Sequence, residues 1–544
     1  MEEQLYRACS DGKVEEVTKL LQNSQININW QDEDGATAFF IACWKGHIEI
    51  VKILLNDKRI EVNKSNKNNQ TPFYIACLQG HIEIVKLLLN DSRVDINIAK
   101  EDGLNDGATP FYIACEYGHL EIVKLLLSDK RIDMNKATND NGTPFYAACQ
   151  NGHIEIVKLL LNDNEIDINE AENEFSKTPF YVACYCGDIE IVRLLLDHNT
   201  IDINKARDGG FTPFYIACFK GHVEIVKLLL SDERVDINKA ANDGFIPFYV
   251  ACGKGHIETV KLLLNDYRVN INAANNDDCT PFYIVCQCGH IDIVKLLLND
   301  NRVDINKTMN GGSTPFYIAC SQGHIEIVKL LLNDNRVDIT KARKDDGSTP
   351  FFIACQEGQI EIVKLLLSDK RIDINKPQSQ GATPFYIACQ EGHIEIVKLL
   401  LNDKRVDINK ARKDDGSTPF WQACYFGHIE IVKVLLNDNR VDINKINEEG
   451  ITPFSIACGE EDIETVKYLL ASGRVMDLFP KNKHEDIARK SKKAMNEEIV
   501  KLLESFENNS NGTRNKLRIE LGFAGKLILR LFIFYFHFSF FIFF

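Results

Sequence analysis

The sequence lacks the features that mark several large classes of protein. It has no excess of positive charge, since 63 Lys and Arg residues face 78 Asp and Glu residues, for a net charge of −15. Neutralisation of phosphates drives binding to nucleic acids and anionic membranes, so this balance disfavours both. Gly-x-Ser-x-Gly, a phosphate-binding loop and His-Glu-x-x-His are also missing. We therefore predict no catalytic residues, no cofactor and no enzyme activity.

No apolar segment opens the chain, because Met1-Glu2-Glu3-Gln4 leads directly into a helical pattern. We therefore expect no signal peptide and a cytoplasmic location. The cysteines agree with a reducing compartment. Neighbouring helices stack about 8–10 Å apart, whereas a disulfide tolerates Cα separations of up to about 7 Å. The recurring cysteines should thus be small buried hydrophobes, and they are Cys9, Cys43, Cys77, Cys115, Cys149, Cys184, Cys218, Cys252, Cys286, Cys320, Cys355, Cys389, Cys424 and Cys458.

What the chain does contain is one stretch repeated many times. The copy that starts at Thr71 reads Thr-Pro-Phe-Tyr-Ile-Ala-Cys-Leu-Gln-Gly-His-Ile-Glu-Ile-Val-Lys-Leu-Leu-Leu, and most copies lie 34 or 35 residues apart. A fixed period of this size predicts a solenoid of stacked units. The other copies start at Thr37, Thr109, Thr143, Thr178, Thr212, Ile246, Thr280, Thr314, Thr349, Thr383, Thr418 and Thr452.

Each unit should fold as two short helices followed by an extended finger. Thr71 suits the cap of the first helix, Pro72 its first position, and Gly80 its end. His81 opens a second helix that is apolar on several sides. The Asn90-Asp91 pair then breaks the helix, and residues 94–97 alternate like an extended segment.

These motifs resemble the ankyrin repeat, whose pattern is Thr-Pro-Leu-His-x-Ala followed by Gly-His-x-x-Ile-Val-x-Leu-Leu. The resemblance runs from about Leu5 to Phe506, with Phe in place of the family's Leu and Tyr in place of its His in the first helix. It implies an all-α solenoid of about fifteen units with helix-turn-helix modules and β-hairpin fingers. A tetratricopeptide array is excluded because nearly half of each period here is Asn, Asp, Lys and Gly.

The ends of the chain depart from the repeat. We expect residues 1–36 to be an N-terminal capping repeat, residues 37–475 to be thirteen tandem repeats, and residues 476–506 to be a degenerate C-terminal cap. A polar linker should follow at residues 507–525. In the longest interval, residues 99–107 should form a more protruding finger.

Residues 526–544 form a Phe-rich apolar tail unlike the rest of the chain. Its length suits a membrane tail anchor flanked by Lys516, Arg518 and Lys526. A low-complexity tail, or an extension of the gene model, is the alternative reading. Membrane association is therefore expected only through this tail.

Two patterns of Cys and His invite a chemical reading. Cys-x-x-x-His recurs in ten units, but equivalent residues of successive units should lie a helix diameter apart, too far to share one zinc ion. We therefore predict no metal site. Cys186, Cys279 and Cys288 lie off the recurring position, and we expect them to be surface thiols without an activating environment.

Comparing the repeats with one another shows where they differ. Variation concentrates in the two residues after each first-helix Cys and in the finger before each Thr-Pro. In the ankyrin family these positions line the concave groove that holds protein partners, and large aromatic residues are the usual anchors. We predict contacts from Trp44, Lys45, Gln70, Tyr117, Lys177, Tyr185, Phe211, Phe219, Lys220, Phe245, Gln356, Glu357, Trp421, Tyr425, Phe426 and Ile451. Phe211 and Phe245 could equally tuck between fingers and helices.

The resemblance thus favours a non-catalytic scaffold or adaptor for protein partners. A version tethered to a membrane by the tail is the second hypothesis, and the regulatory subunit of an enzyme is the third. The sequence names no partner, because ankyrin folds serve many processes.

Overall fold

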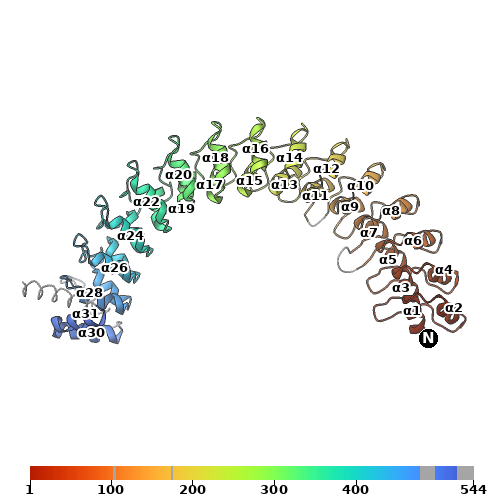
Figure 1. The fold of residues 1–544 in the computed structure, drawn as a ribbon, viewed down its shortest axis with the longest axis horizontal. Coiled ribbons are helices and arrows are strands. Elements are labelled where there is room, and N and C mark those ends of the chain that lie inside the picture. Colours follow the sequence, from red (N-terminus) through yellow and green to blue (C-terminus); the bar gives the residue numbers. More distant parts are fainter. Residues whose placement is uncertain (102–105, 173–174, 478–495, 523–544) are drawn as a thin grey trace, which may run out of the picture. The chain divides into compact units, whose positions relative to one another are not determined.

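The computed structural model describes residues 1–101, 106–172, 175–477 and 496–522, and these residues form helices joined by turns. The chain divides into two units, Met1–Asn276 and Asp277–Phe544. Within each unit, helix pairs follow one another in chain order, with first helices beside first helices and second helices beside second helices (Figure 1). The predicted all-α stack of two-helix modules is confirmed.

Unit 1 contains eight helix pairs among its described residues. The first helices are α1 (Glu2–Ser10), α3 (Ala38–Lys45), α5 (Pro72–Leu78), α7 (Pro110–Glu116), α9 (Pro144–Gln150), α11 (Pro179–Cys186), α13 (Pro213–Lys220) and α15 (Pro247–Lys254). The second helices are α2 (Val14–Leu21), α4 (Ile48–Asn56), α6 (Ile82–Leu89), α8 (Leu120–Leu127), α10 (Ile154–Leu161), α12 (Ile189–Leu196), α14 (Val223–Leu230) and α16 (Ile257–Asn265).

Unit 2 continues the same pattern. Its first helices are α17 (Pro281–Cys288), α19 (Pro315–Ser321), α21 (Pro350–Gln356), α23 (Pro384–Gln390), α25 (Pro419–Tyr425) and α27 (Pro453–Gly459). Its second helices are α18 (Ile291–Leu298), α20 (Ile325–Leu332), α22 (Ile360–Ser368), α24 (Ile394–Leu401), α26 (Ile429–Leu436) and α28 (Ile463–Ala471). Two further helices, α30 (Glu497–Asn508) and α31 (Ser510–Glu520), close the described part of the chain.

Local sequence accounts for the start and end of each first helix. Thr71 Oγ1 accepts the backbone N–H of Tyr74 at 3.1 Å, as predicted for an N-cap. Gly80 follows the first helix with a φ of 75°, in the left-handed region. A Cβ atom there would also lie 2.8 Å from Cε1 of His119 in the next repeat. Glycine is therefore required both by the backbone conformation and by the close approach of the next repeat.

The core of each module consists of the residue types that recur. Phe73, Ala76 and Cys77 are no more than 1% exposed, and Tyr74 is also buried. Burying an aromatic side chain of this size contributes about 1.5–3 kcal/mol relative to leaving it in water. The small Ala and Cys side chains let the next first helix pack closely. The same buried run of residues 73–77, Phe-Tyr-Ile-Ala-Cys or a close variant, therefore occurs in almost every unit.

The fingers differ from the predicted β-hairpins. In the described residues they are successive tight turns, and the structure contains one isolated bridge, between Gln31 and Thr37. Val94 and Ile96 are buried within their finger. Asn97 then joins two fingers, since its Nδ2 donates to the carbonyl of Arg131 at 2.7 Å and its Oδ1 accepts the N–H of Asp133 at 3.0 Å. Side-chain amides thus replace the ladder that paired strands would supply.

In most fingers an arginine bonds to the end of the second helix of the preceding repeat. Arg93 pairs with Asp91, 2.6 Å between Nη2 and Oδ2, and the same nitrogen donates to the carbonyl of Leu55 at 2.9 Å. The last carbonyls of a helix have no partner within the helix, so this bond satisfies one of them from the next repeat. Equivalent bonds run from Arg131, Arg234, Arg268, Arg336, Arg371, Arg405 and Arg440.

The C-terminal end corrects one prediction. Residues 507–525 were expected to be a polar linker, but Ser510–Glu520 forms helix α31, which packs against α28 and α30. Arg518 donates to the carbonyl of Ala471 at 2.9 Å, and Lys467 pairs with Glu520 at the same distance. Thr513 and Leu517 are buried. The polar composition of this segment favoured a linker, because most of its residues face solvent. Only a narrow stripe that includes Thr513 and Leu517 packs against α28 and α30.

Some predicted segments lie outside the described residues. These are most of residues 476–495 in the expected cap, residues 102–105 of the long finger, and the Phe-rich tail from residue 523 onward. Among the described residues, no helix is both long enough and apolar enough to cross a membrane.

Candidate partner-binding surface

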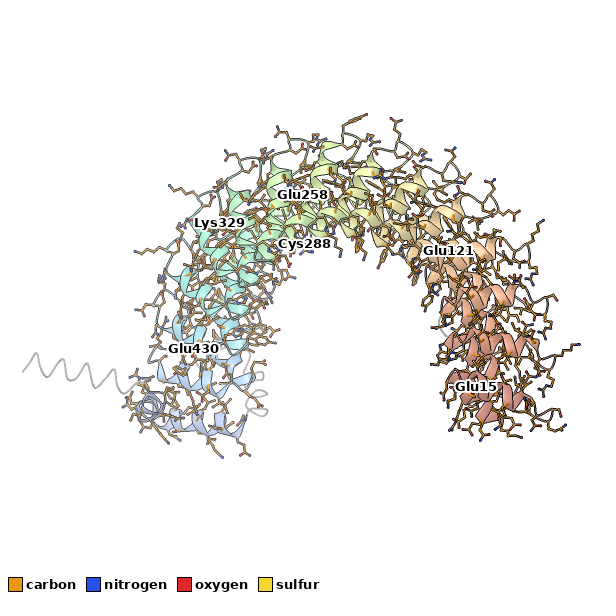
Figure 2. The ribbon with its side chains drawn as sticks, turned by 45° about the vertical axis from the view of Figure 1, so that its right-hand side comes forward. Glu15, Glu121, Glu258, Cys288, Lys329 and Glu430 are labelled. Carbon is orange, nitrogen blue, oxygen red and sulfur yellow. The ribbon has the colours of Figure 1, made fainter. Side chains whose placement is uncertain are left out.

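The variable positions gather along the first-helix side of each unit. We call this surface the variable face and define it by the two residues after each first-helix Cys together with the finger residues before each Thr-Pro. The second helices instead carry a regular stripe of paired charges, such as Glu121 and Lys124, whose charged atoms are 2.6 Å apart. Figure 2 shows Glu121 on the second-helix side of unit 1 and Cys288 on the first-helix side of unit 2.

Several predicted aromatic residues are exposed on the variable face. Trp44 is 42% exposed, Tyr117 56%, Tyr185 46%, Tyr425 38% and Phe426 49%. They follow the buried Cys, where the first helix ends toward its glycine. Large apolar side chains exposed repeatedly at the two positions after this Cys indicate a surface for binding.

Three predicted aromatic anchors are more enclosed. Trp421 is only 7% exposed, and its Nε1 donates to the carbonyl of Ile451 at 3.1 Å. Its ring stacks on Tyr425, with centroids 5.4 Å apart. The sequence-based placement of Trp421 on the surface is therefore wrong, because its position within α25 turns it toward the next finger. Trp421 supports the exposed ring of Tyr425 from below.

Phe211 and Phe245 are partly buried between finger and helix. Phe211 lies against Tyr215, with ring centroids 4.9 Å apart, and Phe245 stacks on Tyr249 at 4.7 Å. The second reading made from the sequence, in which these rings tuck into the stack, is the one that the structure supports. Part of each ring remains accessible.

The other predicted contact residues are polar or intermediate in exposure. Lys177 lies with Nζ 3.7 Å from Glu172 and 4.5 Å from the ring centroid of Phe175, so its charge is already engaged. Gln70 accepts a hydrogen bond from Asn66 at 2.9 Å. Glu357 is exposed beside Gln356, and Ile451 is partly exposed at the finger that receives Trp421.

Lysines alternate with aromatic rings along the variable face of unit 1. The Nζ atom of Lys220 lies 4.2 Å from the ring centroid of Tyr185, and that of Lys254 lies 4.6 Å from the centroid of Phe219. In each case the lysine comes from the repeat after the ring. Such cation–π contacts contribute about 0.5–1 kcal/mol at exposed sites. They fix the rings and leave positive charge on the surface.

The sequence analysis did not predict two of the cationic residues that lie against these rings, Lys254 and Arg207. Lys254 occupies the same position as Lys45 and Lys220, and comparison of the repeats could have found it. Arg207 donates from Nε to the hydroxyl of Tyr181 at 2.8 Å, and its Cζ lies 4.4 Å from the centroid of Phe211. No local pattern marks Arg207. Its hydrogen-bond partner Tyr181 lies 26 residues earlier in the chain, and its ring partner Phe211 lies four residues later.

The recurring histidines hold the repeats together. Nε2 of His81 lies 3.0 Å from the carbonyl oxygen of Trp44, in the preceding repeat, and equivalent contacts recur in both units. A carbonyl only accepts, so this nitrogen carries the proton and has no lone pair for a metal ion. The Cys-x-x-x-His spacing thus serves packing and repeat-to-repeat bonding.

The buried cysteines are poor nucleophiles. Burial raises the pKa of Cys9 to about 12 and holds the pKa of the deeper thiols, such as Cys77, well above the ordinary value. Cys279, which we expected at the surface, is 7% exposed. Cys186 and Cys288 are exposed as predicted. For Cys186, burial followed by the charge of Asp188 raises the pKa, which disfavours the thiolate.

Comparison with known proteins gives one family. The family model described as ankyrin repeats (3 copies) matches residues 5–102, 95–172, 164–241, 233–309, 297–378, 318–414, 385–482 and 420–516. No curated protein matches the chain. Among solved structures, the crystal structure of the human ASB11 ankyrin repeat domain is similar, with 23% identity over 39% of this chain and 90% of that chain, and a TM-score of 0.34.

Proposed function

This chain belongs to the ankyrin-repeat family, whose repeats generally mediate protein–protein interaction, and from that premise we propose that it is a non-catalytic scaffold that holds a protein partner along the variable face. One observation carries the proposal. The modules are nearly constant in their cores and second helices, while exposed aromatic rings recur at the two positions after the first-helix Cys. A surface that differs from repeat to repeat on a constant frame suits recognition.

The chemistry of the variable face supports a protein as the partner. Rings such as Tyr185 and Tyr425 offer large contact areas at low entropic cost, which is why Tyr and Trp dominate binding hot spots. Lys220 and Lys254 add fixed positive charge between rings in unit 1. In unit 2, Trp421, Tyr425 and Phe426 form a continuous aromatic cluster. These groups match apolar and acidic side chains of a polypeptide.

The experiment is affinity capture with the full chain and two matched double variants. Tyr425→Ser with Phe426→Ser removes the exposed rings of unit 2, whereas Glu430→Ser with Lys433→Ser removes a charge pair from the neighbouring helix α26. We expect the first variant to lose at least tenfold in affinity for captured proteins, since truncating a hot-spot ring costs about 2 kcal/mol or more. The second variant should bind like the wild type.

The thermal midpoint of each variant decides how a loss is interpreted. Tyr425 and Phe426 are exposed, so their removal should leave the midpoint within a few degrees. Unchanged capture by the ring variant would contradict the proposal for unit 2. An equal loss of affinity in both variants would mean that the second helices also take part in binding and that the variable face is not the specific surface.

A further inference from the structure

A hollow of about 540 Å³ opens on the variable face near the start of unit 1. It lies between the fingers that carry Asp34 and Lys67 and the first helices α1, α3 and α5. Its lining includes Tyr6, Asp32, Phe40, Trp44 and Gln79. A concave site of this volume, with aromatic walls and converging charged and amide side chains, can hold one side chain of a ligand.

The aromatic wall already attracts a cation. Trp44 is 42% exposed, and its ring is held by an edge contact with Phe40, with centroids 6.3 Å apart. The chain's own Lys45 places Nζ 5.2 Å from the Trp44 centroid. The faces of an indole ring carry negative potential, and Trp is the strongest of the aromatic residues in binding cations.

The two carboxylates of the hollow have different roles. Oδ1 of Asp32 accepts the N–H groups of Asp34 and Ala36, at 3.0 and 2.7 Å, and so shapes the finger turn. The Tyr6 hydroxyl also bonds to Asp32, and burial together with this carboxylate keeps the pKa of Tyr6 well above its ordinary value. Tyr6 therefore remains a neutral donor.

Asp34 is the carboxylate that is available to a ligand. Its carboxylate is exposed and has no hydrogen-bond or ion-pair partner among the described residues, although its backbone N–H and carbonyl are both bonded. Lys67 supplies the ammonium of the lining, and its backbone N–H donates to the carbonyl of Asp34 at 2.9 Å. The lining carries two carboxylates against the ammonium of Lys67, and Lys45 adds a second ammonium beside Trp44. The groups that favour a positively charged ligand are therefore the exposed carboxylate of Asp34 and the ring of Trp44.

We propose that this hollow binds an arginine side chain of the protein partner, with the guanidinium plane stacked on Trp44 and paired with Asp34. Arginine fits better than lysine because its planar, weakly hydrated cation both stacks on aromatic faces and pairs with carboxylates through two parallel bonds. The inference rests on the proposed function and adds to it the chemistry of one contact.

The test uses the full chain and three tripeptides, Ac-Ala-Arg-Ala-NH₂ and its lysine and citrulline analogues. Citrulline keeps the planar shape of arginine and removes its charge. Binding is followed by saturation-transfer NMR and by the change in tryptophan fluorescence. We expect the arginine peptide to bind at least fivefold more tightly than the citrulline peptide, since a cation–π contact and an ion pair together contribute about 1 kcal/mol or more.

Two neighbouring acidic residues give a matched pair of variants. Asp34→Asn should weaken arginine-peptide binding by about threefold or more, while Glu33→Gln, at an exposed position on the same finger outside the hollow, should leave it unchanged. Lys67→Gln should strengthen it, because the ammonium of the lining is removed. Trp44→Leu should abolish the fluorescence change that the peptide produces.

Equal binding of the arginine and citrulline peptides, or equal effects of Asp34→Asn and Glu33→Gln, would overturn the inference. These outcomes are separate from failure of the proposed function. If Asp34→Asn and Glu33→Gln act alike on arginine-peptide binding while protein capture still depends on Tyr425 and Phe426, the arginine site is disproved and the scaffold function stands. If Asp34→Asn alone weakens arginine-peptide binding but protein capture does not depend on Tyr425 and Phe426, the arginine site stands and the scaffold function is disproved.

Discussion

His119 lies with Nε2 2.9 Å from the carbonyl oxygen of Leu78, and its ring covers Gly80 in the same preceding repeat. One side chain, at the start of a second helix, thus fixes the end of the first helix in the preceding repeat. The carbonyl that it binds belongs to the first of the two variable residues after Cys77. The histidine row therefore holds in place the backbone on which the variable face is built.

Replacing this histidine should loosen one junction between repeats. We expect His119→Ala to destabilise the junction by about 0.5–1.5 kcal/mol, the net value of one intramolecular hydrogen bond. His119→Gln should be milder, because Gln359 naturally replaces this histidine and donates from Nε2 to the carbonyl of Ser321 at 3.1 Å. Amide hydrogen exchange across residues 72–89 is the measurement, and equal effects of Ala and Gln would contradict this role.

Asp188 occupies the histidine position without being able to donate. Burial raises the pKa of Asp188, so the folded state binds its proton more tightly than the unfolded chain does. Loss of that proton above the ordinary pKa therefore costs stability at neutral pH. The carbonyl of Gln150 instead receives the Cys186 thiol at 3.5 Å, a weak donor.

Asp188→His should therefore raise stability at pH 7 by about 1 kcal/mol. The same change at Asp462 should gain less, because Oδ1 of Asp462 also accepts the N–H of Thr465 at 3.1 Å as a helix cap. Denaturant unfolding of both variants at pH 7 tests the ranking. A larger gain at Asp462 than at Asp188 would show that this capping bond is unimportant.

Thr259 places a hydroxyl where most repeats carry an apolar side chain. Its Oγ1 is buried without a hydrogen-bond partner in the described structure, and the equivalent residues include Ile225 and Ile293. Thr259→Val keeps the shape and removes the hydroxyl, so it should stabilise the fold by about 1–2 kcal/mol. The control is Thr18→Val, because Thr18 is exposed and already bonds to the carbonyl of Val14. Thermal unfolding checks both variants.

The finger Asp–Arg pairs should make the chain sensitive to acid. The hydrogen bonds from Arg93 hold the pKa of Asp91 below its ordinary value of 3.8. Stability from the pair is then fully present above that value and is lost as pH falls through the lower pKa of the folded state. The same direction holds at Asp57, Asp129, Asp232, Asp266, Asp300, Asp334, Asp369, Asp403 and Asp438.

Asp91→Asn should therefore lower stability at pH 7 by about 0.2–1 kcal/mol, and the difference from wild type should shrink below pH 4. Glu83→Gln removes a more exposed carboxylate from the second-helix stripe and serves as the comparison. Urea midpoints measured at pH 7 and pH 3 give both differences. A difference for Asp91→Asn that stays constant with pH would contradict the assignment.

The sequence by itself determined the repeat, its two helices, the Thr caps, the terminal glycines and the buried Cys. These depend on residues close together in the chain, so Thr71, Gly80 and Cys77 could be assigned from local chemistry. The same comparison of repeats located the exposed rings of Trp44, Tyr185 and Tyr425, whose role in binding stays a prediction.

Only the tertiary structure decided what the repeats do to one another. The bonds of His119, Arg93 and Asn97 each join residues more than thirty positions apart, and the burial of Trp421 depends on where the next finger lies. Helix α31 was likewise recognised only from the structure, in which it packs on α28. Stacking places chemically similar residues in different surroundings, and for that physical reason no single repeat reveals its own contacts.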